Sequence, residues 1–317
     1  MKTTLAICCL IVVVADAGGF PYFNRIKDTR NAENTKAASL IGSTCVATKV
    51  DNTVLCSSIS TPSFTGVNTK ESPLVGTLTD IVHAILKEGS SIVQTVQNLK
   101  VRQEQQQKSQ ALEKSKISSI QSVWEYHSNH ILEHLQASES ILFPKVFSKE
   151  SSSIATALVQ GHGMIRQLIK EVTNQVECLE DLRLDRDSNV VSSNNNGPDQ
   201  TVLAIQDLSD QICQCEQALA KQLEVDLETM FSQVENNNNT SPSSTSSSSS
   251  WGSLMRKYMS GGGVDQGSFI SAMGEDTFRS EWMTNRGIPS FVWHASFKRS
   301  LSKFQYKFIH PLNEILL

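Results

Sequence analysis

The sequence predicts an all-α protein: an antiparallel four-helix bundle, followed by a flexible linker and a small helical C-terminal segment. The first observation is that four long segments between residues 72 and 235 carry apolar side chains at helical spacing. The second is that polar segments at residues 185–200 and 236–250 interrupt and follow them. Amphipathic helices joined in this way bury their apolar stripes against one another.

The composition restricts the class of partner. The chain has 317 residues, of which 39% are hydrophobic, and a formal net charge of −4. We expect no nucleic-acid partner, because this charge balance does not attract a polyanion. No run of eighteen apolar residues exists, so we expect no membrane span once an N-terminal signal has been removed.

Residues 1–19 have the pattern of a secretory signal peptide. A basic residue precedes a short apolar run, and an Ala-x-Ala cleavage signal follows it. We therefore expect the chain to enter the secretory pathway. Residues 20–71 are polar, and we expect a disordered or transit-like extension. Because Phe20-Pro21 is similar to the corresponding part of bipartite plastid leaders, a plastid destination is the alternative.

The expected helices begin and end at recognisable signals. The first begins at Ser72-Pro73, with proline at the first helical position. The second is expected over about residues 111–147, the third over about residues 152–182 and the fourth over about residues 201–234.

The C-terminal part begins after a tract of low complexity. Residues 236–250 are four asparagines followed by a serine-rich stretch, which predicts a flexible linker. Residues 251–317 are expected to form short helices. The chain ends inside an apolar run, so this segment is expected to be the start of a second, truncated helical unit.

Three histidines organise the second helix. His127, His130 and His134 are spaced by three and four residues, which places them on one helical face together with Ile120 and Val123. This face is expected to point into the core. The row indicates a ligand site inside the bundle, or else three histidines tolerated near its rim.

Landmarks on all four helices resemble hemerythrin-like (HHE cation-binding) domains. They are Val82-His83-Ala84-Ile85 on the first helix, His134 nine residues before Phe143-Pro144 on the second, His162-Gly163-Met164-Ile165 on the third, and the acidic residues 224–231 on the fourth. The apolar C-terminal run is similar to the start of a further such repeat in plant BRUTUS-type iron-sensing ubiquitin ligases. Unlike those ligases, the chain has no Cys-x-x-Cys pair for a RING.

The resemblance implies a non-catalytic bundle that binds or senses iron, as one ion or as a di-iron centre. The metal ligands that it implies are His83, His130, His134, Glu139, His162 and Asp226. The implied partner is thus a metal ion, and no protein partner is indicated.

Departures from the family pattern support an alternative. Ser138 stands where the family has a glutamate, and Glu139 follows His134 by five residues, about 140° around an α-helix. Glu139 therefore needs local unwinding to reach the same site. Arg166 places a cation where the family has a ligand, and Gln222 replaces a histidine. The alternative is a degenerate, metal-free interaction module.

We do not expect an enzyme. No glycine-rich phosphate loop or nucleophile elbow is present. His130-Ile131-Leu132-Glu133-His134 fits the inverted zinc-peptidase pattern, but that pattern fixes only three residues.

Overall fold

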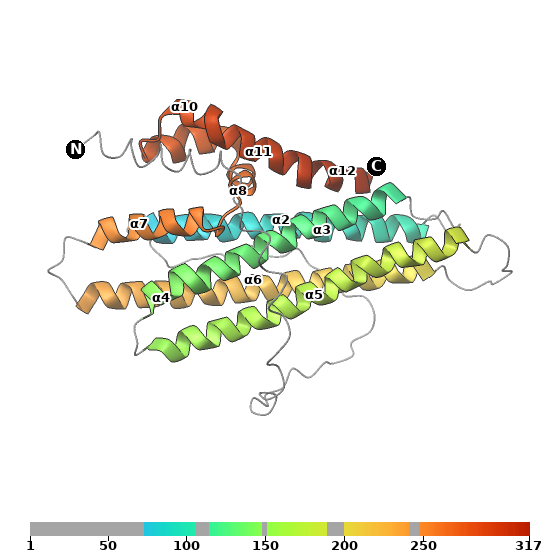
Figure 1. The fold of residues 1–317 in the computed structure, drawn as a ribbon, viewed down its shortest axis with the longest axis horizontal. Helices are drawn as coiled ribbons and strands as arrows, with labels where there is room; N and C mark the ends of the chain where they lie inside the picture. Colours follow the sequence, from blue (N-terminus) through green and yellow to red (C-terminus); the bar gives the residue numbers. More distant parts are fainter. Residues whose placement is uncertain (1–72, 106–113, 148–150, 189–199, 241–246) are drawn as a thin grey trace, which may run out of the picture. The chain divides into compact units, whose positions relative to one another are not determined.

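The structure, a computed structural model, describes residues 73–105, 114–147, 151–188, 200–240 and 247–317 (Figure 1). These residues are helical over most of their length and contain no strand, which confirms the all-α prediction for the described part of the chain. No helix within these ranges is long and apolar enough to cross a membrane. The expected signal peptide and the extension that follows it lie outside the described residues.

Four long helices form the larger part of the fold. They are α2 (Pro73–Gln105), α3 (Lys114–Ala137), α5 (Ser152–Ser188) and α6 (Gln200–Thr240). Helix α2 contacts α3 and α6, and helix α5 contacts the same two helices. The apolar stripes meet between these helices and form one buried core.

Contacts between neighbouring helices show that they run in opposite directions. Trp124 in α3 donates to Thr173 in α5. Further along the chain from Trp124, Glu139 contacts His162, which precedes Thr173 in α5, so the two helices are antiparallel. The pairs of residues in contact between α5 and α6, and between α2 and α6, also run in opposite order along the two helices, so these helices are antiparallel as well.

The second expected helix is interrupted near its end. Helix α3 continues into a π-helical turn, η1 (Ser138–Leu142), and then into α4 (Phe143–Val146). Pro144 explains a wider turn here, because its ring clashes with the carbonyl four residues earlier and it has no N–H to donate. Such a turn contains one more residue than an α-helical turn.

The C-terminal segment packs against the long helices. It comprises α7 (Ser247–Ser260), α8 (Gln266–Met273), α9 (Glu275–Thr277), η3 (Phe278–Met283), α10 (Ser290–Val292), η4 (Trp293–Phe297), α11 (Lys298–Phe304), η5 (Gln305–Ile309) and α12 (His310–Leu316). Helix α8 contacts α2, and α12 contacts α2 and α3. Leu312 and Ile315, in the apolar run at the end of the chain, are buried by this packing.

The stretch between α6 and α7 is shorter than expected. Helix α6 continues to Thr240 and α7 begins at Ser247, so helices occupy both ends of the range expected to be a linker. Residues 241–246 lie outside the described residues.

Candidate functional site

The histidine row of α3 points into the core, as its spacing predicts. His127 is 0% exposed, and His130 and His134 are each 4% exposed. Burying a polar ring without a partner is costly, so the partner of each nitrogen determines what the row does.

One cluster joins three of the expected site residues, of which His162 and Asp226 are buried and Glu139 is partly buried. His162 Nδ1 lies 2.8 Å from Glu139 Oε1, and His162 Nε2 lies 2.7 Å from Asp226 Oδ2. We call these three residues the Glu139 cluster. They come from η1, α5 and α6, so the cluster exists only when these elements are packed together.

The π-helical turn explains how Glu139 reaches the cluster. In a π-helix the hydrogen bonds join residues five apart, so the side chain five residues after His134 returns towards the same face. The local unwinding that the sequence required is therefore present at Ser138–Leu142. π-helical turns inside α-helices occur frequently at functional sites.

Two further side chains hold the carboxylates of this cluster. Arg166 Nη2 lies 2.8 Å from Glu139 Oε1, so the unfavourable cation expected from the sequence forms an ion pair with that glutamate. Gln222 Nε2 donates to Asp226 Oδ1 at 2.8 Å.

A second buried cluster consists of Glu88, His127 and Glu216, and we call it the Glu88 cluster. His127 Nδ1 lies 2.8 Å from Glu88, and His127 Nε2 lies 2.9 Å from Glu216. Burial alone would lower the pKa of His127, but the charge and hydrogen bond of Glu216, with those of Glu88, raise it to about 10. His127 is therefore an imidazolium between two carboxylates from α2 and α6 at neutral pH.

His130 and His134 bind groups from the C-terminal segment. The backbone N–H of Asp265 donates to His130 Nε2 at 3.1 Å, so His130 Nδ1 carries the proton and donates to Glu88. His134 Nδ1 lies 2.7 Å from the Tyr258 hydroxyl and 3.3 Å from the Gly263 carbonyl. Burial, with the neighbouring His130 adding to it, lowers the pKa of His134 to about 3.

The structure does not bring His83 to these clusters, because its side chain is exposed on α2. Sequence analysis missed Glu88, Glu216, Tyr258 and Asp265. A signal exists for the first two: Glu88 lies between Ile85 and Ile92, and Glu216 between Ile212 and Leu219, so each carboxylate stands inside an apolar stripe at helical spacing.

As arranged, these donors do not fit a metal ion. Among the described residues, no three His, Cys, Asp or Glu side chains form a group that could hold one. The nitrogens of His127 and His162 face carboxylates of the protein, and Arg166 is bonded to Glu139. A metal would have to displace these contacts.

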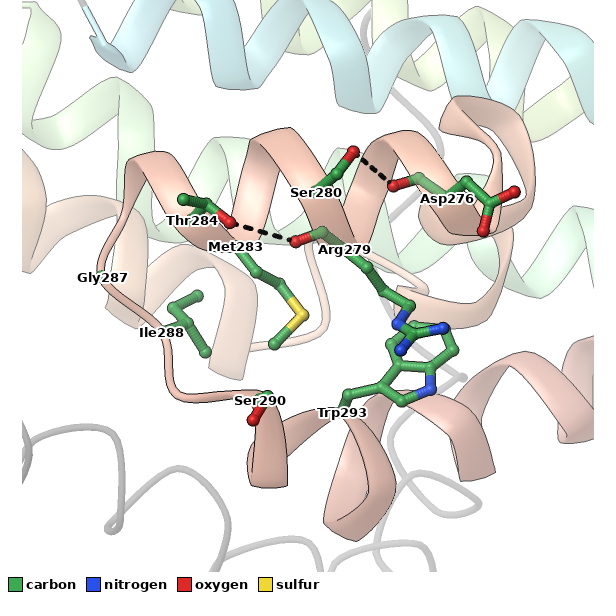
Figure 2. A pocket seen from close by; sticks show the side chains of 9 residues that line it. All are labelled: Asp276, Arg279, Ser280, Met283, Thr284, Gly287, Ile288, Ser290 and Trp293. Atoms are coloured by element: carbon green, nitrogen blue, oxygen red, sulfur yellow. Dashed lines mark hydrogen bonds between the residues drawn. The ribbon is translucent and has the colours of Figure 1, made fainter.

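Among the depressions on the surface of the described residues, two bear on possible sites. One, of about 400 Å³, is lined by Glu139, Phe143 and Val159 among others, and gives solvent a route to the Glu139 cluster. The other lies in the C-terminal segment (Figure 2), where Arg279 stands over the Trp293 ring at 5.3 Å. The Ser280 hydroxyl in it donates to a carbonyl of its own helix, so it is not arranged as a nucleophile.

Searches against models of protein families, curated proteins and solved structures yield no match to this chain.

Proposed function

We propose that α2, α3, α5 and α6 form an antiparallel four-helix bundle of the hemerythrin-like type, and that this bundle is a non-catalytic, metal-independent interaction module. The contacts of each helix with two others, and the opposite directions of neighbouring helices, support the architecture. The ion pair between Arg166 and Glu139 carries the functional part of the proposal.

This ion pair replaces a charge that a metal would supply. Glu139 and Asp226 are the two carboxylates that the family resemblance assigns to iron. A carboxylate withdrawn from water needs a compensating partner. Arg166 and His162 are the partners of the partly buried Glu139, while His162 and Gln222 are those of the buried Asp226. Arginine stays protonated at any physiological pH, so the compensation is permanent.

Iron binding is the second candidate, and one observation favours it. Glu139, His162 and Asp226 lie together, and Gln222 holds Asp226 through the oxygen that faces away from His162. Metal ligands are usually oriented by outer hydrogen bonds of this kind.

Iron titration of the full chain under anaerobic conditions distinguishes the two. We expect the parent to bind no iron above the buffer control and Arg166→Glu to bind it, because the substitution frees Glu139 and adds a carboxylate. Lys170→Glu is the matched control, with the same charge change one turn further along α5, and should behave as the parent. Iron uptake by the parent, abolished by His162→Ala, would contradict metal independence and support the second candidate.

A further inference from the structure

A short stretch of the C-terminal segment lies directly on the histidine row. Residues 258–265, which we call the strap, lead from the end of α7 to α8. Nδ1 of His134 is hydrogen-bonded to the Tyr258 hydroxyl and to the Gly263 carbonyl. The Asp265 N–H donates to Nε2 of His130. The strap thus holds one ring nitrogen of each of these two buried histidines.

Three consecutive glycines allow the strap to lie this close. A Cβ at Gly261 would fall 2.7 Å from Cδ1 of Ile141 in the π-helical turn, and Gly262 has a φ of 89°. A Cβ at Gly263 would fall 2.5 Å from the Tyr258 ring. Because the Tyr258 ring is fully buried, a side chain at residue 263 would displace it from its packing position.

Asp265 fixes the other end of the strap. Its N–H donates to His130, its Oδ1 accepts from the Ser268 N–H at 2.8 Å as the N-cap of α8, and its Oδ2 accepts from the Tyr126 hydroxyl at 2.7 Å. One residue therefore ties the strap both to α3 and to the start of the next helix.

We propose that the strap is an autoinhibitory element that closes the histidine row of α3 and opens separately from the rest of the fold. The strap is held against α3 by the Tyr258 hydroxyl, two backbone groups and the Asp265 carboxylate, whereas the side chains of the Glu139 and Glu88 clusters come from η1 and the long helices. The proposal goes beyond the proposed function, because it holds whether or not the Glu139 cluster takes a metal.

Residue-resolved modification by diethyl pyrocarbonate, read by peptide mass spectrometry on the full chain, tests the proposal. In the parent, exposed His83 should react, and His130, His134 and His162 should be protected. Gly263→Ala, which expels the Tyr258 ring, should raise the rates at His130 and His134 by about tenfold or more. Gly163→Ala is the matched control, because a Cβ there meets nothing within 4 Å.

His162 distinguishes opening of the strap from general unfolding, because it is fully buried and both of its ring nitrogens are bonded to carboxylates outside the strap, those of Glu139 and Asp226. Its continued protection in Gly263→Ala, with His130 and His134 reactive, supports the proposal. Tyr258→Phe, which keeps the ring and removes only the hydroxyl, should raise the rate at His134 alone. Unchanged protection of the row in Gly263→Ala overturns the proposal, and so does simultaneous exposure of His162.

Discussion

Gly89 shows how tightly one buried charge is fitted. It lies in α2 against the carboxylate of Glu216, and a Cβ at this position would overlap the Oε2 atom. Glu216 is fully buried, and its other oxygen is bonded to His127. Among the residues that the structure describes, no group donates a hydrogen bond to the Oε2 atom. A glycine inside a helix weakens it, so its place here is explained by the space that the carboxylate requires.

We predict that Gly89→Ala lowers the free energy of unfolding by about 1–3 kcal/mol, because the added Cβ would displace the buried Glu216 carboxylate from its contact with His127. Gly163→Ala should instead raise it by about 0.5–1 kcal/mol, since Gly163 is exposed and its Cβ would lie in open space. Urea denaturation of both variants measures the difference. Equal changes in the free energy of unfolding for the two variants would mean that the side chains around Glu216 can rearrange to admit the added methyl group.

At the scale of the element, the π-helical turn decides which side chains face the core. It adds one residue between His134 and Phe143, so the Glu139 side chain turns towards His162. In a continuous α-helix the same glutamate would lie about 140° from His134.

Deletion of Ser138 should therefore be tolerated. The deletion returns the turn to α-helical spacing and leaves the glutamate four residues after His134, on the same face. We expect a cooperative thermal transition for this variant. Deletion of Gln121 in the regular part of α3 should abolish that transition, because it rotates all preceding side chains by about 100° relative to those that follow. Loss of cooperativity in both variants would show that the extra residue is not what the turn accommodates.

At the scale of the whole molecule, the buried histidines respond to pH in opposite directions. The pKa of His127 is raised to about 10 in the folded protein, because the carboxylates outweigh the effect of burial. Its stabilising contribution is complete below the unfolded value of about 6.5 and is lost as the pH rises through 10. The pKa of His134 is lowered to about 3 by burial, so its contribution is present above about 6.5 and is lost as the pH falls.

We predict that the free energy of unfolding is greatest near pH 6.5 and falls on both sides. Urea denaturation between pH 4.5 and 9 measures the profile. His134→Phe should flatten the acid side, since the ring that resists protonation is removed. His83→Gln should leave the profile unchanged, because His83 is exposed. An acid side that persists in His134→Phe would assign the loss to other groups.

The sequence by itself determined the helices and the inward face of the histidine row. Both follow from local periodicity: a side chain at helical spacing within an apolar stripe must be buried whichever neighbours cover it. The landmarks at His134, His162 and Asp226 likewise placed three polar groups inside the protein, and all three are buried.

Only the tertiary structure decided what those groups bind. The partners of His127 and His130 lie between 39 and 135 residues away in the sequence, on elements whose rotation and register no local pattern specifies. A one-residue widening of a helix turned Glu139 inward, and Arg166 became its partner. Periodicity fixes which face of a helix is buried, but the pairing of buried charges depends on how whole helices pack, because each charge must find its partner across the core.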